Sequence, residues 1–455
     1  MSVHQPVVAG TFYPADPNAL GQAVHGLLQG APKLGVPQPK ALILPHAGYR
    51  FSGAVAAAGA VNLSAGEGIR RVVILGPSHH VRFQGLALPD ADAMATPLGT
   101  VPIDPVAVEQ LLKTPDVNVV PEAFAREHAI EVELPFLQVR LGAFAVVPLV
   151  VGEIAPDRLA AILDALWGGD ETLIVISTDL THFLTGAEAA KIDLATAQAI
   201  ETHRAEGLSG REACGHRPLT AFLHCAAKRG LRLTRLALTH SGKVTGDEAR
   251  VVGYGAWMAH DPEVAQLSLA HKREAFRVAA RALVSRARSG KVPAIDLTTF
   301  PAPLQSVAHS FITLTLEGRL RGCIGSLKAH QPLAKDVMEN AIKAGFSDPR
   351  FRPVTEDEIL SSEIEIAVLS HPAPMTFASE EDLRGQLRPG RDGLILASGA
   401  KRGTFLPKVW DSLETPEKFL NGLKVKAGLP GDHWSDDMQV LRYVTETFRG
   451  RIGKT

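Results

Sequence analysis

The chain is poor in several features, and each scarcity excludes a class of protein. Its 455 residues include only 3 cysteines, too few for a disulfide framework, which favours a reducing compartment. Apolar runs such as "FAVVPLVVG" are far shorter than the roughly 18 residues that a membrane helix needs. The start, "MSVHQPVVAGTFYPADP", has neither the basic nor the apolar part of a signal peptide. We therefore expect a cytoplasmic protein without a membrane anchor.

An excess of charge of either sign is also missing. Lysine plus arginine number 47 and aspartate plus glutamate number 48, so the charge balance predicts neither nucleic acid nor an anionic membrane as a partner. What the chain does have is 45% hydrophobic residues, which suits globular cores, and a length that suits two large domains.

The first part of the chain, residues 1–262, alternates short β-branched runs with helical patterns. The expected strands are 41–44, 71–75, 144–150, 172–176 and 250–254. The expected helices are 17–29, 52–60, 104–113, 128–140, 156–167 and 185–204. Strands that are apolar on both sides and separated by helices indicate a sheet covered on both faces. We expect an α/β domain here.

A break in this pattern at 259–266, "AHDPEVAQ", separates the first domain from a second one, residues 268–455. Residues 269–290 have the pattern of one amphipathic helix. Several short alternating runs follow, among them "HSFITLTLEGRLRGCIGS" and "EIEIAVLS", and they indicate antiparallel hairpins and strands. The second domain is therefore expected to be α+β.

Histidines stand beside several of the expected strands. His46, His79 and His182 each follow a strand, and His240 precedes the last one. Parallel strands end at one edge of a sheet, which is where open α/β sheets bind ligands. A single loop histidine is ordinarily solvated, but four at one edge predict a metal or acid–base site, because imidazole is the commonest metal ligand. Asp179, three residues before His182, is expected to fix the tautomer of that ring.

Further candidates surround these histidines. The stretch "REHAIEVELPFL" is expected to be helical, which places His128 and Glu131 one turn apart on a face toward the same edge. An exposed helix start rich in acidic residues is the alternative. Glu127 and His80, each next to another candidate in the sequence, are expected to contact either a ligand or the metal-binding rings.

These stretches resemble the Memo family, whose bacterial members are called AmmeMemoRadiSam system protein B. The resemblance runs from residue 6 to about 258 and rests on "AGTFYPADP", "PHAGYRFSG", "LGPSHH", "EHAIEVELPFL", "STDLTHF", "GHRP" and "SGKVTGDEARVVGYGAW". From about 268 to 450 the chain resembles the AMMECR family, or system protein A, through "LRGCIGSL", "GFSDPRFRPVTEDE", "IEIAVLSHPAP", "PGRDGLIL" and "GTFLPKVW". The resemblance implies a fusion of two partners whose third member is a radical SAM protein.

The Memo fold is similar to that of class III extradiol dioxygenases, which use non-haem Fe(II). On that resemblance, His46 and His79 match two metal ligands, and His182 matches a histidine that does acid–base work. Animal Memo proteins have a cysteine in the segment that corresponds to 238–247, and this chain has none there. His240 is the nearest side chain that would replace it as the third ligand. Fe(II) is therefore the expected metal, with copper or zinc as alternatives.

The second part offers a different kind of candidate. "LRGCIGS" carries Arg321 and Cys323, and one hypothesis makes Cys323 a nucleophile activated by neighbouring cations. The alternative, which we expect, is a small buried residue in a tightly packed strand. Asp348 and Arg350 in "SDPRF" are expected to form a local charge pair.

Three functions are compatible with the sequence. The first is a metal-dependent redox or dioxygenase-like enzyme that acts on an unknown small molecule or peptide beside a radical SAM partner. The second is an adaptor that binds metal or peptide without turnover, and the third is chemistry centred on Cys323. The third metal ligand distinguishes the enzyme from the adaptor, because an incomplete set of ligands favours the adaptor.

Overall fold

The computed structural model describes residues 2–31, 33, 38–63, 68–261, 267–326, 328–435 and 437–452. Its contacts divide the chain into two compact units, Met1–Ala226 with Leu233–His260, and Ala227–Arg232 with Asp261–Thr455. Most of the break expected at 259–266 lies outside the described residues. Over the part of the chain that is described, none of the helices has the length and apolar character needed to span a bilayer.

The first unit is a mixed α/β fold. Its strands are β1 (Val3–His4), β2 (Ala41–Leu44), β3 (Arg71–Pro77), β4 (Leu86–Leu88), β5 (Ala93–Thr96), β6 (Gly99–Pro102), β7 (Val117–Val119), β8 (Ala145–Val151), β9 (Thr172–Ser177), β10 (His182–Leu184), β11 (Arg232–His240) and β12 (Val251–His260). Its helices are α1 (Pro17–Gly30), α2 (Tyr49–Ala60), α3 (Pro105–Leu111), α4 (Pro121–Phe124), η1 (Glu131–Glu133), α5 (Leu134–Leu141), α6 (Pro156–Ala165), α7 (Gly186–Glu201), α8 (His216–Lys228) and α9 (Gly242–Thr245).

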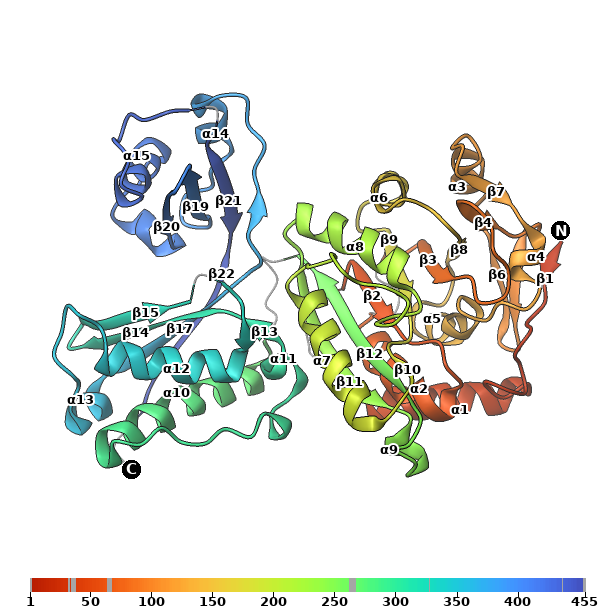
Figure 1. Ribbon diagram of the computed structural model, residues 1–455, viewed down its shortest axis with the longest axis horizontal. Helices are drawn as coiled ribbons and strands as arrows, with labels where there is room; N and C mark the ends of the chain where they lie inside the picture. The colour runs from red at the N-terminus through yellow and green to blue at the C-terminus, as the bar shows by residue number, and fades with distance from the viewer. Residues whose placement is uncertain are drawn as a thin grey trace. The chain divides into compact units, whose positions relative to one another are not determined.

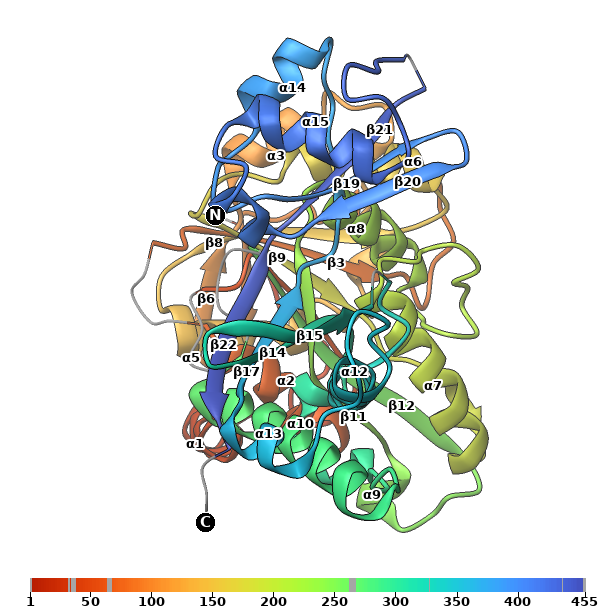
Figure 2. The ribbon, with the colours of Figure 1, turned by 90° about the vertical axis from the view of Figure 1, so that its left-hand side faces the viewer.

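A central sheet organises this unit. Its strand order is β10-β12-β2-β9-β3-β8-β4-β7, with β11 paired to β12. The strands β2, β9, β3 and β8 are mutually parallel and almost wholly buried. Helices α1, α2 and α5 lie on one side of the sheet, and α6, α7 and α8 lie on the other (Figures 1 and 2). Because helices cover both faces, these strands are the apolar runs that the sequence predicts.

The expected helix over 128–140 is only partly present. Residues 126–130 are not helical, and regular structure starts with η1 and continues into α5. The reason is local: the buried Glu127 carboxylate accepts the backbone N–H groups of His128 and Ala129 at 2.9 and 3.0 Å. These side-chain bonds hold the segment in an irregular turn. His128 and Glu131 are therefore not one helical turn apart on a common face.

The second unit is α+β. Its strands are β13 (Val307–Ala308), β14 (Ser310–Leu316), β15 (Arg319–Gly325), β16 (Gln331–Pro332), β17 (Glu363–Leu369), β18 (Ala373–Pro374), β19 (Gly393–Ser398), β20 (Lys401–Phe405), β21 (Gln439–Tyr443) and β22 (Thr445–Arg451). Its helices are α10 (Leu269–Ser289), η2 (Leu297–Thr299), α11 (Ala302–Gln305), α12 (Leu333–Phe346), α13 (Glu356–Ser361), α14 (Glu380–Gln386), η3 (Pro407–Asp411) and α15 (Pro416–Lys426).

Two four-stranded antiparallel sheets and the two-stranded antiparallel pair β13-β16 lie in this second unit. The order of strands in the two larger sheets defines its framework. The first has the order β15-β14-β17-β22 and packs against α10 and α12, and the second has the order β18-β21-β19-β20 and packs with α14 and α15 (Figure 1). The β14–β15 hairpin turns at Glu317 and Gly318, both with positive φ (52° and 77°), as a tight two-residue hairpin requires. The α+β prediction for this part is confirmed.

Candidate metal centre

Two of the expected histidines lie at the ends of nearby strands. His46 follows β2, His79 follows β3, and β9 lies between these strands in the sheet. Since the three strands are parallel, their carboxyl ends share one edge. Between the two histidines, β9 ends at Ser177, with Asp179 two residues on. This edge therefore gathers two imidazoles, a hydroxyl and a carboxyl group.

His128 joins them from the irregular segment between α4 and η1. A Cβ on Gly76 of β3 would lie 2.9 Å from the Cβ of Ala129, so a glycine at this position allows the segment to approach the sheet closely. The Ser177 hydroxyl donates to the Ala129 carbonyl at 2.6 Å, which fastens the segment to the end of β9. Close packing at Gly76 thus brings His128 to the strand ends.

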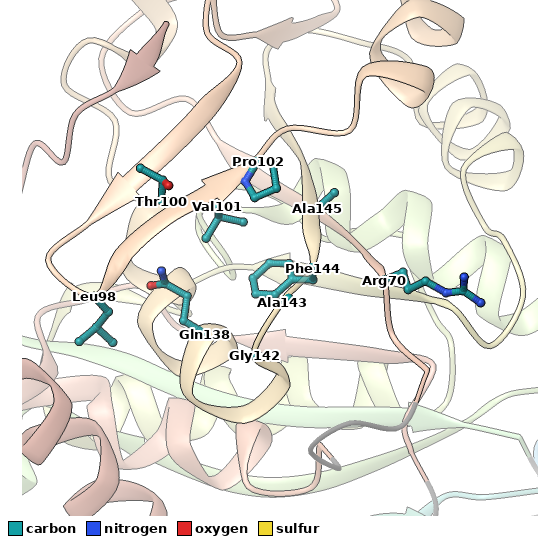
Figure 3. Close-up of a pocket in the computed structure, with 10 residues that line it drawn as sticks. All are labelled: Arg70, Leu98, Thr100, Val101, Pro102, Gln138, Gly142, Ala143, Phe144 and Ala145. Atoms are coloured by element: carbon teal, nitrogen blue, oxygen red, sulfur yellow. The ribbon is translucent and has the colours of Figure 1, made fainter. Parts of the chain in front are cut away.

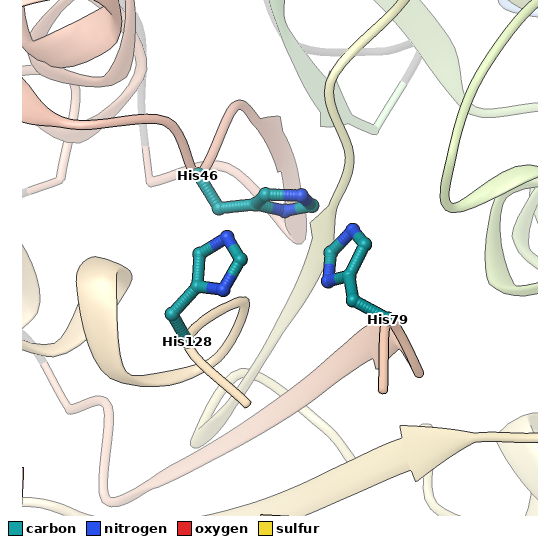
Figure 4. A group of neighbouring side chains, drawn as sticks. All are labelled: His46, His79 and His128. Carbon is teal, nitrogen blue, oxygen red and sulfur yellow. The ribbon is translucent and has the colours of Figure 1, made fainter. Parts of the chain in front are cut away.

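The three rings face one another, as Figure 4 shows. His79 and His128 are stacked, with centroids 5.0 Å apart and planes 15° apart. His46 meets both edge-on, with centroid separations of 5.1 and 5.4 Å. One nitrogen from each ring lies within 4.8 Å of the others, so the cluster could hold a metal ion. His46 is buried and His79 is exposed, which leaves the cluster open to solvent on one side.

A buried hydrogen-bond chain orients His46. Its Nδ1 lies 2.8 Å from Ser177 Oγ. Ser177 Oγ lies within donating distance of the Ala129 carbonyl and of Glu133 Oε1, at 2.6 and 3.1 Å. Because the hydroxyl proton points to these acceptors, the hydroxyl oxygen accepts from His46 Nδ1–H. The lone pair of His46 is then on Nε2, the tautomer that a metal ligand needs.

A carboxylate orients His79 in the same way. Glu127 is only 4% exposed, and its Oε1 accepts from His79 Nδ1 at 2.8 Å. Its Oε2 accepts the backbone N–H of His79 at 2.7 Å. The side chain therefore fixes both the backbone and the ring of His79, and it leaves Nε2 as the free ligand atom. A carboxylate behind a histidine is a common arrangement in metal sites.

The electrostatics favour neutral rings in two of the three positions. Burial, and secondarily the nearby histidines, hold the pKa of His46 well below its usual value. Burial lowers the pKa of His128 to about 4. For His79, burial acts to lower the pKa, but the hydrogen bond and charge of Glu127 outweigh it and raise the pKa overall. Neutral imidazole is the form that binds metal. Protons therefore compete with a metal ion mainly at His79.

Asp179 and His182 are near the cluster, but not in the relation that the sequence predicts. Asp179 Oδ1 accepts the backbone N–H of His46 at 2.9 Å, because the end of β9 lies next to the end of β2. His182 Nδ1 instead bonds the Leu180 carbonyl at 2.8 Å, so Leu180 rather than Asp179 fixes its tautomer. Burial raises the pKa of Asp179 to about 7, and burial lowers the pKa of His182.

His240 does not belong to the three-ring cluster. It ends β11, beyond β12 from the other strand ends, and its Nε2 lies 3.6 Å from Glu248 Oε2. The third ring of the cluster is therefore that of His128, and His240 as a ligand stays a prediction. His80 is exposed, with its ring centroid 6.4 Å from that of His79. Glu131 turns away to the amino-terminal segment, where it accepts the N–H groups of Val7 and Val8 and the hydroxyl of Tyr13.

Three residues at the centre were not expected from the sequence: Ser177, Glu133 and Cys214. Glu133 is completely buried, and burial raises its pKa well above the usual value. Cys214 Sγ lies 3.4 Å from His46 Nε2, and burial raises the pKa of this thiol to about 12. The only sequence signal for Ser177 is its place at the end of an apolar run, and Cys214 has none.

The first unit also has a pocket away from the histidine cluster. Its cavity of about 590 Å³ is lined by Arg70, Gln138 and Phe144, among others (Figure 3). Arg70 immediately precedes β3, and Phe144 precedes β8, so the pocket is at the amino ends of the parallel strands. Ligands of open α/β sheets bind at the carboxyl ends. The histidine cluster is therefore the better candidate site.

In the second unit, Arg321 is fully engaged in packing. Its guanidinium pairs with Glu358 at 3.0 Å and donates to the carbonyls of Arg352 and Pro353. It is only 9% exposed. These contacts connect β15 to α13 and give Arg321 a structural role.

The fold and the cluster together define an α/β protein with a three-histidine centre, followed by an α+β domain. The chain belongs to the Memo-like protein family, which it matches over residues 4–258, and residues 276–448 match the AMMECR1 family. It is thus a fusion of the two domains.

The chain is similar to several individual proteins. A MEMO1 family protein of Aquifex aeolicus is 35% identical over 269 residues, which cover 56% of this chain and 98% of that protein. A protein of Thermotoga maritima is 35% identical over 173 residues, which cover 38% of this chain and 94% of that protein. The crystal structure of an uncharacterised protein from Pyrococcus horikoshii covers 38% of this chain and 89% of its own, with 32% identity and a TM-score of 0.36.

Proposed function

We propose that the Memo-like domain binds one divalent metal ion through His46, His79 and His128, and that Fe(II) at this centre supports dioxygenase-like oxidation of a small substrate. The observation that carries the proposal is the mutual approach of three ring nitrogens within 4.8 Å, two of them oriented by buried partners. Three imidazoles suit iron, copper and zinc. The choice of iron rests on the resemblance to class III extradiol dioxygenases.

The residues fit a metal ion on chemical grounds. Two of the rings are neutral at pH 7, and hydrogen bonds at Nδ1 place the lone pair on Nε2 of His46 and His79. The Cys214 thiol lies 3.4 Å from Nε2 of His46 and would make way for the metal. Bound iron would supply a redox-active Lewis acid with positions open to substrate and oxygen. In the proposed site His128 brings the ligand set to three members, and a complete set leaves catalysis open.

His182 is the proposed proton-handling group. Its Nδ1 is bound to the Leu180 carbonyl, so Nε2 carries the lone pair and can accept a proton. Its ring is close enough to the cluster for its charge to lower the pKa of His46. Since it is not one of the three clustered rings, it is free to exchange a proton with a substrate held beside them.

The test combines metal analysis with turnover. Protein loaded with Fe(II) under anaerobic conditions is expected to hold close to one equivalent and to consume oxygen when presented with metabolite mixtures. Binding of zinc or copper in preference to iron, without oxygen consumption, would instead favour the non-catalytic adaptor. We further propose a radical SAM protein of the same system as the partner, which co-purification from a host that carries both would test.

A further inference from the structure

A second cluster of reactive and charged side chains surrounds Cys323 on β15, in the AMMECR1 domain. It shares no residue with the histidine centre, and its chemistry is independent of the function proposed for that centre. A Cβ at Gly322 would lie 2.1 Å from the Ala344 carbonyl of α12, and one at Gly325 would lie 2.2 Å from the ring of Phe311. These two glycines are explained by packing. Cys323 between them is partly exposed, so it is not the buried residue that the sequence suggests.

A buried carboxylate holds a guanidinium against this cysteine. Asp348 is 4% exposed, and its Oδ2 accepts the backbone N–H of Cys323 at 2.8 Å. The same carboxylate accepts Nε and Nη2 of Arg350 at 2.9 and 2.7 Å. Arg350 Nη2 also donates to the Cys323 carbonyl at 3.2 Å. The expected charge pair of Asp348 and Arg350 is confirmed, and it fixes an otherwise half-exposed cation beside Cys323.

Two further groups approach the thiol from other elements. Thr313 of β14 lies across the ladder from Cys323, and its hydroxyl donates to Cys323 Sγ at 3.4 Å. Lys426, the last residue of α15, is near enough for the charges of Cys323 and Arg350 to act on it. Burial lowers the pKa of Lys426, and the charge of Arg350 lowers it further. Reactive cysteines are found in partly exposed surroundings of this kind, beside hydroxyl donors and basic side chains.

We propose that Cys323 is the nucleophile of a second reactive site, which takes small acyl donors that carry a negative charge, and that Arg350 and Lys426 bind that charge. In the covalent step, the sulfur forms a bond to the carbonyl carbon of the donor, and the bond from that carbon to the leaving oxygen breaks. The oxygen leaves with the electron pair, and the thiol proton passes to solvent. Arg350 is aimed by Asp348, so Asp348 is a positioning residue.

The charge preference is tested by alkylation of the full chain with iodoacetate and with iodoacetamide, read at Cys323 by peptide mass spectrometry. In both reactions the sulfur displaces iodide, so the two probes differ only in charge. The ratio of the iodoacetate rate to the iodoacetamide rate is expected to exceed that of N-acetylcysteine. Arg350→Gln and Lys426→Gln are each expected to lower the ratio roughly fivefold, the effect of one unit charge at about 4 Å in a water-like dielectric.

Two control variants show whether a change in the alkylation ratio comes from the charge near Cys323. Arg319→Gln removes an exposed charge from the other end of β15 and is expected to leave the ratio unchanged. Arg350→Lys keeps the charge and should retain most of the effect, which separates loss of charge from loss of fold. A ratio equal to that of N-acetylcysteine, or one insensitive to both charge-removing variants, would overturn the anion-binding role.

Acyl transfer is tested separately with acetyl phosphate. Cys323 is expected to gain one acetyl group that hydroxylamine removes, whereas Cys323→Ser gains none of this hydroxylamine-labile product. The buried Cys225 serves as an internal reference that should stay unmodified. If acetyl phosphate leaves Cys323 unmodified while iodoacetate reacts, the assignment of an acyl donor is wrong.

Discussion

Glu127 gives the sharpest test of how the histidine centre is built, through the substitution Glu127→Gln. Glutamine can keep an oxygen where Oε1 accepts from His79 Nδ1, His128 N and Ala129 N. Its amide nitrogen then faces the backbone N–H of His79, where Oε2 is the acceptor at 2.7 Å. One buried donor is left without an acceptor, which costs about 1–3 kcal/mol of folding stability. Loss of the carboxylate behind the ligand should lower metal affinity by about 10–100-fold.

The measurement is a competition titration against a chelator, under anaerobic conditions and at several pH values. Glu127 raises the pKa of His79, so wild-type affinity falls as pH drops through that raised pKa. In Glu127→Gln the metal affinity begins to fall at a lower pH. The difference in metal affinity between the two proteins should therefore become smaller in acid. The exposed Glu122→Gln is the matched control and should bind as wild type. A folded Glu127→Gln with wild-type affinity, or a gap that widens in acid, would refute this reasoning.

Three further predictions concern neighbouring residues. His182→Ala should keep full metal content and lose turnover by about 10²–10⁴-fold, measured by metal analysis and oxygen uptake; loss of the metal would make His182 a ligand instead. Ser177→Ala leaves the buried Nδ1–H of His46 without its acceptor and should weaken metal binding by about 10–100-fold in the same chelator titration. Burial raises the pKa of Asp193 to about 6, so the native state holds its proton more tightly than the unfolded chain, and stability declines as pH rises from about 4 to 6 and the carboxyl group ionises. Asp193→Asn should therefore stabilise the protein at pH 8 by up to about 2–3 kcal/mol and not at pH 4, as followed by urea unfolding; an equal effect at both pH values would contradict it.

The parallel strands were predictable because their sequences are apolar on both faces. β2, β3, β8 and β9 all appear within a residue or two of their expected bounds. The strand β11 was missed because "RLTRLALTH" contains two arginines that resemble a solvated edge. In the structure both arginines are buried, and Arg235 pairs with Glu201 of α7 at 2.6 Å. The sequence of β11 alone does not show that its arginine has a buried partner on another element.

The site was predictable only in part for a similar reason. His46 and His79 follow strands, so strand topology alone brings them together. His128 depends on a contact between Ala129 and Gly76, two positions that are far apart in the sequence and show no shared pattern. His240 stands next to a strand too, but the order of strands in the sheet separates it from the others. Neither relation could be derived without the tertiary fold.

The central claim is that His128, and not His240, completes the centre with His46 and His79. Metal content after anaerobic loading, measured by mass spectrometry on the wild type and on His128→Ala and His240→Ala, tests this most directly. The wild type and His240→Ala should each hold about one equivalent, whereas His128→Ala should lose most of it, with all three proteins folded by circular dichroism. Full metal in His128→Ala together with its loss from His240→Ala would contradict the account.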